Sequence, residues 1–162
     1  MAEKMVRKET GEEISQEMVQ VLKERFDYTE EQIRNLSPTQ WTWMDTVERK
    51  KQYRIIMEVL WAENCACKPE KGDRFVFTGN GMLLPEESSF PVMCMWALQA
   101  IFPFLLQISE RFVAGLDPSP VGWNRVKCFD IGYACGSMGE VLFRIYCEKS
   151  PAYATTPLGK VI

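Results

Sequence analysis

Cysteine is the residue type in this sequence that is best suited to chemistry, and six cysteines are present. A cysteine thiolate is both a nucleophile and a ligand for zinc and iron. Cys147 falls on the apolar face of an expected strand, and we interpret it as a buried hydrophobic residue. The other five lie near the ends of expected helices and strands, where a ligand can be presented without disrupting a hydrogen-bond ladder: Cys65, Cys67, Cys94, Cys128 and Cys135.

The spacing of these cysteines indicates a metal site. Cys65 and Cys67 form a C-x-C pair, which is a weaker metal pattern than C-x-x-C because both thiolates converge only on an unusual backbone. Cys94 begins an expected helix, where the helix dipole favours a thiolate. With Cys128 or Cys135 nearby, these residues predict a four-thiolate zinc or iron–sulfur site. The alternative is that the cysteines only pack in loops, on a helix face and on a strand.

Catalytic hypotheses are limited by the absence of histidine. This absence excludes Cys-His and Ser-His pairs and imidazole ligands. A nucleophilic cysteine would therefore need a helix N-terminus or a neighbouring cation, and Cys94 is the candidate. Carboxylate chemistry could use acidic residues of the expected loops, although the same residues are common in turns and caps. These are Asp73, Glu86, Glu87, Asp117 and Asp130.

The elements that must position the cysteines begin after a helical section, residues 1–50. Capping-box spacing occurs at Thr10, at Thr29 and at Ser37, the last followed by a proline that suits the first helical position. Apolar residues at helical intervals predict one helix over residues 11–26 and two shorter helices after it.

From Tyr53 the apolar period changes to two, which predicts a strand with its odd-numbered residues, through Trp61, facing a core. Between Val92 and Val113 the sequence predicts one long helix. Pro103 should kink this helix by freeing the carbonyl of Gln99. Internal glutamines and missing basic anchors favour a core helix over a membrane span. Further strands are expected at residues 74–78, 125–131 and 140–148.

This order of elements predicts an α+β fold, with a helical N-terminal section followed by a mostly antiparallel four-stranded sheet and one long helix packed across it. The expected domains are the helical section, 1–50, an α+β cysteine-bearing core, 51–150, and an irregular tail, 151–162.

Charge and the N-terminal residues bound the location and the partners. The 19 basic and 22 acidic residues give a net charge of −3, which argues against a nucleic acid partner. The first residues contain no apolar signal-peptide region, so we expect a cytoplasmic protein with reduced cysteines and no membrane attachment. Trp41 and Trp43 lie two apart on an expected helix and cannot both face inward, so one of them indicates a contact with a protein partner or with a second copy.

Short motifs of a known family are spread over residues 53–148. They are Tyr53 to Glu63, Cys67-Lys-Pro-Glu-Lys-Gly-Asp-Arg-Phe-Val-Phe77, Cys94-Met-Trp-Ala-Leu98 with Phe102-Pro-Phe-Leu105, Val126-Lys-Cys-Phe-Asp130 and Val141-Leu-Phe-Arg-Ile145. With them the chain resembles a family of small, uncharacterised proteins of anaerobic bacteria and archaea, built as strand, cysteine loop, strand, cysteine-led helix and two strands. The family's third strand ends in Cys-Pro-Asp, whereas this chain has phenylalanine in place of the proline. The resemblance implies this fold and a thiolate site shared by the cysteines at positions 67, 94 and 128.

The leading functional hypothesis is a small cysteine-bearing protein that binds a metal or iron–sulfur centre, or a redox partner. Its ligands would be Cys67, Cys94 and Cys128, with Cys65 or Cys135 as the fourth. One alternative is a non-catalytic accessory subunit that docks through its helical N-terminus. The other is an enzyme with a pocket between the long helix and the sheet, using Cys94 or a carboxylate.

Overall fold

The computed structural model describes residues 5–7, 10–120 and 122–149, and the chain forms two compact units that divide between Asp45 and Thr46. The predicted irregular tail, 151–162, lies outside the described residues. Among the described residues, no helix is long and apolar enough to cross a membrane.

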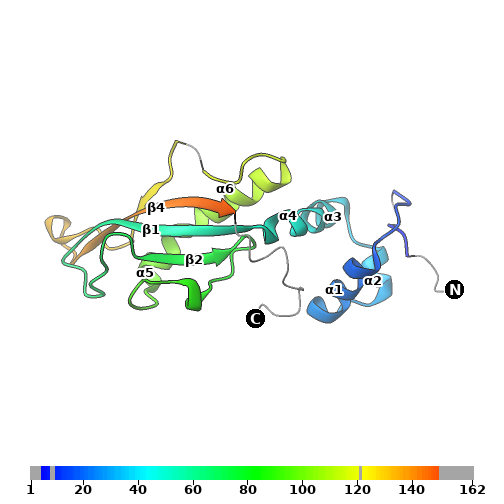
Figure 1. Ribbon diagram of the computed structural model, residues 1–162, viewed down its shortest axis with the longest axis horizontal. Coiled ribbons are helices and arrows are strands. Elements are labelled where there is room, and N and C mark those ends of the chain that lie inside the picture. The colour runs from blue at the N-terminus through cyan, green and yellow to red at the C-terminus, as the bar shows by residue number, and fades with distance from the viewer. Residues whose placement is uncertain (1–4, 8–9, 121, 150–162) are drawn as a thin grey trace. The chain divides into compact units, whose positions relative to one another are not determined.

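The first unit contains three helices, α1 (Gln16–Phe26), α2 (Glu30–Arg34) and α3 (Pro38–Asp45) (Figure 1). The capping boxes predicted at Thr29 and Ser37 are confirmed, because each side chain and the glutamine three residues later bond each other's backbone N–H. These reciprocal bonds fix where α2 and α3 begin. The core of the unit consists of Met5, Ile14, Val19, Leu22, Ile33, Leu36 and Trp41.

Two details of this unit test the sequence prediction. The predicted start of the first helix at residue 11 is wrong. The helix begins at Gln16, capped by the Ser15 hydroxyl, while the Thr10 hydroxyl bonds Glu12 in the preceding turn. The expectation that Trp41 and Trp43 cannot both face inward is confirmed, because Trp41 is buried and Trp43 is 46% exposed.

The second unit is built on an antiparallel four-stranded sheet in the order β2-β1-β4-β3. The strands are β1 (Tyr53–Glu63), β2 (Arg74–Thr78), β3 (Arg125–Lys127) and β4 (Glu140–Lys149). The predicted α+β class and the four-stranded antiparallel sheet are confirmed, although the third strand is shorter than the residues 125–131 expected. The short helix α4 (Val47–Lys51) leads into β1.

The period of two in β1 is confirmed over its first half, because Ile55, Met57 and Val59 are fully buried in one core. Trp61, predicted on the same face, is instead 41% exposed. The pairing with β4 shifts register between Val59 and Trp61. Such a bulge turns the following side chains, which a strict alternation does not foresee.

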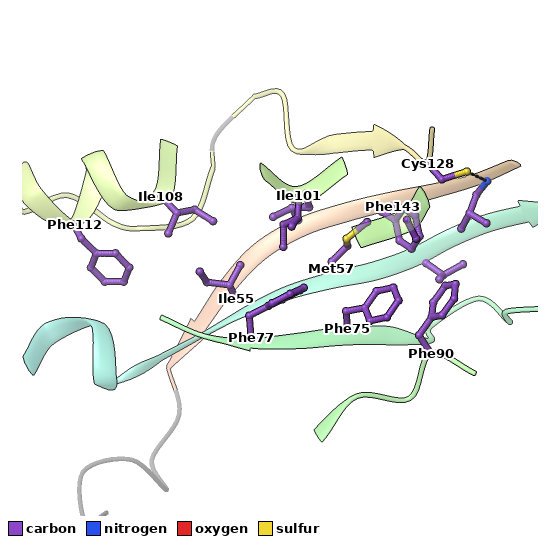
Figure 2. Close-up of a cluster of buried hydrophobic side chains, with 14 residues drawn as sticks. Ile55, Met57, Phe75, Phe77, Phe90, Ile101, Ile108, Phe112, Cys128 and Phe143 are labelled. Atoms are coloured by element: carbon purple, nitrogen blue, oxygen red, sulfur yellow. Dashed lines mark hydrogen bonds between the residues drawn. The ribbon is translucent and has the colours of Figure 1, made fainter. Parts of the chain in front are cut away.

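The long helix is formed as α5 (Met95–Leu98), a 3₁₀ turn (Gln99–Ile101) and α6 (Phe102–Val113). A 3₁₀ turn thus interrupts the α-helix just before Pro103, where the sequence predicts a kink. The predicted free carbonyl is wrong, because the carbonyl of Gln99 accepts the N–H of Phe102. Figure 2 shows Ile101, Ile108 and Phe112 pointing from this segment toward the sheet. Further 3₁₀ turns lie at Pro85–Glu87 and Tyr133–Cys135.

Candidate functional site

The C-x-C pair lies in a tight turn directly after β1. The N–H of Lys68 donates to the carbonyl oxygen of Cys65 at 3.0 Å. Asn64 and Lys68, which flank the pair, both adopt positive φ angles, 50° and 49°. Residues other than glycine seldom adopt this left-handed conformation. The turn therefore provides the unusual backbone that two cysteines separated by one residue need to approach one another.

The thiol of Cys67 is the centre of a cluster of three cysteines. The thiols of Cys94 and Cys65 lie close enough to act on its pKa. Burial, then the unfavourable interaction with the charges that Cys94 and Cys65 would carry, raise the pKa of Cys67 to about 12. All three side chains are half-buried and pack on the main core of the second unit. We call Cys65, Cys67 and Cys94 the thiol cluster.

Cys128 lies beside this cluster at the end of β3. Its N–H donates to the carbonyl of Val141 at 2.9 Å, and its sulfur accepts the N–H of Val141 at 3.3 Å, the bond drawn in Figure 2. Its thiol also bonds the carbonyl oxygen of Asp130. Burial is the main cause that raises the pKa of Cys128, and the neighbouring Cys65 contributes in the same direction. Cys128 is therefore within electrostatic range of the thiol cluster.

Gly139 connects the start of β4 with the cysteine turn. A Cβ atom at this position would lie 2.5 Å from the carbonyl oxygen of Asn64 and 2.8 Å from the backbone nitrogen of Cys65. Distances below 3 Å between such atoms are not tolerated. Only glycine lets the two backbone segments approach this closely, so Gly139 sets the position of the turn that carries Cys65.

The chain matches no protein-family model, no curated protein and no solved structure. The family resemblance inferred from the sequence thus stays a prediction, and the function is argued from the site alone.

The remaining cysteines lie apart from the thiol cluster. Cys135 is exposed in a 3₁₀ turn, and its electrostatic neighbour is Lys127. Cys147 packs against the core in β4 opposite Ile55, and burial raises its pKa to about 12. Among the described residues, no group of three or more Cys, Asp or Glu side chains is placed so that it could hold a metal ion.

The candidates for catalysis are placed as follows. Cys94 precedes α5, which has only four residues and so carries a small dipole, and its thiol contacts Cys67. Four of the five candidate carboxylates take part in hydrogen bonds or an ion pair within the structure. Asp73 accepts the backbone N–H of Glu70 and the hydroxyl of Ser89, Glu87 pairs with Arg54, Asp117 accepts the N–H of Ser119, and Asp130 organises a loop. Glu86 lies in the 3₁₀ turn Pro85–Glu87.

Asp130 organises the glycine-rich connection between β3 and β4. Its carboxylate accepts the backbone N–H groups of Gly132, Met138 and Gly139 at 3.1–3.3 Å. The Ser137 hydroxyl first, and then these N–H groups, hold the pKa of Asp130 below its usual range. The carboxylate thereby fixes Gly139, on which the cysteine turn rests.

The substitution Asp130→Asn should loosen this connection. An amide has one weaker acceptor where the carboxylate offers two charged oxygens, so the amide hydrogens of Met138 and Gly139 should exchange several-fold faster. The contribution of Asp130 to stability is present above the ordinary carboxyl pKa, near 4, and is lost as the pH falls below it, because the folded-state pKa is lowered.

Hydrogen exchange followed by mass spectrometry measures this effect. Asp117→Asn, which removes a similar acceptor from the N–H of Ser119, is the matched control outside the loop. Unchanged protection of Met138 and Gly139 in Asp130→Asn would contradict the role assigned to the carboxylate.

An open groove of about 1110 Å³ lies between the long helix and β3 with its following loop. Trp96 and Phe129 line it and are stacked, with ring centroids 5.3 Å apart and an interplanar angle of 18°. Cys128 belongs both to the groove wall and to the surroundings of the thiol cluster. We call this cavity the β3 groove.

The sequence does not predict the aromatic residues of the β3 groove. Trp96, Phe102 and Phe129 are each about three-fifths exposed. Helical periodicity could not assign Trp96 to a face, because α5 is shorter than two turns. Gly139 was also missed, since a glycine in a glycine-rich loop does not indicate a close backbone contact.

Proposed function

We propose that the protein binds a thiophilic metal ion, zinc or iron, through Cys65, Cys67 and Cys94, with Cys128 as the fourth ligand. The observation that carries the proposal is the packing of all three cysteines of the cluster on one core, close enough for two of the thiols to act on the pKa of the third. Thiolates this close repel one another, and a bound cation replaces the repulsion with attraction. Four cysteines are a common ligand set of structural zinc sites and of iron–sulfur clusters.

Metal binding would displace the thiol protons, and the thiols would have to turn about their side-chain bonds toward one point. Because the pKa of Cys67 is raised, its thiol keeps its proton at neutral pH and releases it more easily as the pH increases. The affinity for metal should therefore increase with pH. The N–H of Val141, which donates to the Cys128 sulfur, favours the thiolate form. A reducing compartment such as the cytosol would keep these cysteines available, and we propose that location.

The site would join three segments of the second unit. The cysteine turn after β1 would supply two ligands, and the start of α5 and the end of β3 would supply one each. Zinc would supply a structural cross-link, and an iron–sulfur centre would supply one-electron transfer. The predicted family resemblance supports the same three segments through Cys67, Cys94 and Cys128.

Metal analysis of protein purified without oxygen tests the proposal, together with titration by cobalt(II) as a spectroscopic substitute for zinc. About one metal ion or cluster per chain is expected. Cys67→Ser should weaken cobalt(II) binding roughly 100-fold, since each thiolate supplies about a quarter of a large binding energy.

Cys147→Ser is the matched control, because Cys147 lies on β4 opposite Ile55, away from the cluster. It should bind cobalt(II) like the parent protein. A parent protein that binds neither zinc, iron nor cobalt would overturn the proposal, and so would unchanged binding in Cys67→Ser.

An accessory role in which the protein docks on a partner is a second candidate. The exposure of aromatic side chains in the β3 groove favours it, as does that of Trp43 in the first unit. Large exposed apolar patches of this kind mark interaction sites on soluble proteins.

A further inference from the structure

β3 is the last strand of the sheet, so its outer edge has no neighbouring strand in the order β2-β1-β4-β3. The N–H of Cys128 bonds the carbonyl of Val141 in β4. In an antiparallel ladder successive residues direct their backbone groups to opposite sides. The N–H and C=O groups of Arg125 and Lys127 therefore point away from β4.

The outer edge of β3 faces the start of the long helix. Phe129, the next residue of the same alternation after Lys127, donates its N–H to the carbonyl oxygen of Trp96 in α5 at 3.0 Å. Within the described ranges, no other backbone group bonds the outward N–H of Lys127 or of Arg125. Along the outer edge, the backbone N–H is thus hydrogen-bonded at Phe129, whereas the edge is open at Arg125 and Lys127.

The opposite edge of the sheet, at β2, is covered by the chain itself. The N–H of Thr78 bonds the carbonyl of Met82, and the N–H of Leu84 bonds the carbonyl of Val76. The hydroxyl of Ser88 takes the N–H of Val76. Proteins commonly protect sheet edges in this way because an open edge pairs with other strands. Within the described chain, the β3 edge has no such cover, so it is the edge that is open to pair with another strand.

The β3 groove runs along the open edge. Its helix side presents Trp96, Phe102 and Pro103, and its strand side presents Phe129 and Ile131. All five are exposed to solvent. An apolar groove beside an open strand edge is the arrangement in which peptide-binding domains add an extended segment to their sheet.

We propose that the β3 groove binds an extended peptide segment of a partner protein, which pairs as a strand with the outer edge of β3. Alternate side chains of the peptide would pack against Trp96 and Phe102. A bound helix would leave the edge unpaired, because a helix satisfies its backbone groups internally. The inference does not rest on metal binding by the thiol cluster.

The positive charges of β3 favour an acidic peptide and disfavour pairing with β3 of a second copy of this chain. Two copies of β3 paired about a twofold axis at Val126 would place Arg125 of one opposite Lys127 of the other. Like charges directly opposite each other destabilise a pair of strands. A peptide in which apolar residues alternate with Asp or Glu would place acidic groups beside Arg125, which is exposed, and apolar groups in the groove.

The test is selection from a display library of random heptapeptides on the intact protein, followed by synthesis of an enriched peptide. The decisive variants are Lys127→Pro and Lys127→Ala. Both remove the side chain and its ion pair with Glu140, but only proline removes the outward N–H. Proline is tolerated at such edge positions. Lys127→Pro should bind the peptide about tenfold more weakly than Lys127→Ala.

Phe102→Asp is the second variant, in case Lys127→Pro is poorly folded, because its position is exposed and forms the groove wall. It should also lose peptide binding. Equal affinity of Lys127→Pro and Lys127→Ala with binding kept in Phe102→Asp would overturn the proposal, as would a library without enriched peptides. A concentration-dependent dimer that Lys127→Pro disrupts would assign the edge to a second copy instead. Cys67→Ser should keep peptide binding, which separates this result from the metal proposal.

Discussion

Gly139→Ala is expected to lower the free energy of unfolding by about 2 to 3 kcal/mol, an overpacking cost typical of a tightly packed site. The added methyl group would meet the backbone of Asn64 and Cys65, and neither is the end of a flexible side chain that could move aside. The cysteine turn should therefore shift away from the start of β4. Because burial and the neighbouring thiols of Cys65 and Cys94 raise the pKa of Cys67, a shift of the turn should make its reaction with a disulfide reagent at pH 8 faster.

Gly79→Ala is the matched control for this effect. A Cβ at Gly79 would lie even closer to a backbone atom, the carbonyl oxygen of Lys50. This position lies at the other end of β1, where Arg54 pairs with Thr78. Denaturation by urea should show a similar loss of stability, whereas the rate of thiol reaction should not change. Faster reaction in both variants would mean that the rate reports general unfolding, and the role assigned to Gly139 would be wrong.

Much of the fold could be predicted from the sequence because its patterns are local. The alternation that starts at Tyr53 located β1, and the glutamines that follow Thr29 and Ser37 at capping distance located two helix starts. The exceptions have non-local causes. Trp61 leaves the core face at a bulge that depends on the pairing with β4.

The start of α1 was also not predictable from the local sequence pattern. Thr10 and Ser15 both offer a hydroxyl that can cap a helix, and the sequence spacing favoured Thr10. The structure uses Ser15, because Glu13, which lies between them, pairs with Val6 in an isolated antiparallel bridge. A choice between two adequate caps is decided by contacts outside the local pattern.

The sequence predicts that the candidate site consists of cysteines, but it does not predict which cysteines belong to it. Cys67, Cys94 and Cys128 lie at the ends of the expected elements, and the structure places Cys94 close to Cys67. The sequence leaves the choice between Cys65 and Cys135 open, and the structure places Cys65 near both Cys67 and Cys128. That choice depends on left-handed backbone at positions flanking the C-x-C pair, which are not glycines and so carry no sequence signal.

Lys50→Met is expected to stabilise the protein at pH 7. The Lys50 side chain is fully buried and its ammonium group lies 5.9 Å from the ring centroid of Phe112. Burial lowers the pKa of Lys50 to about 8, and attraction by Glu110 opposes this in part. Relative to the ordinary value of 10.5, this shift corresponds to an upper limit of about 3 kcal/mol that the folded state loses by keeping the charge. Methionine has a similar length and no charge, so a gain of about 1 to 3 kcal/mol is expected.

The pH dependence identifies the cause of that gain. Between pH 8 and 10.5 the unfolded chain keeps the Lys50 proton and the folded chain has released it, so the contribution of Lys50 to stability rises with pH over this window. Chemical denaturation of both proteins from pH 7 to 10, under reducing conditions, should therefore show a difference that shrinks as the pH increases. Taking the difference also removes the opposite trend from Tyr146 and Cys147, whose pKa values are raised. Lys71→Met, at an exposed position, should give no such pH-dependent gain; a constant difference in Lys50→Met would assign the stabilisation to packing and not to the buried charge.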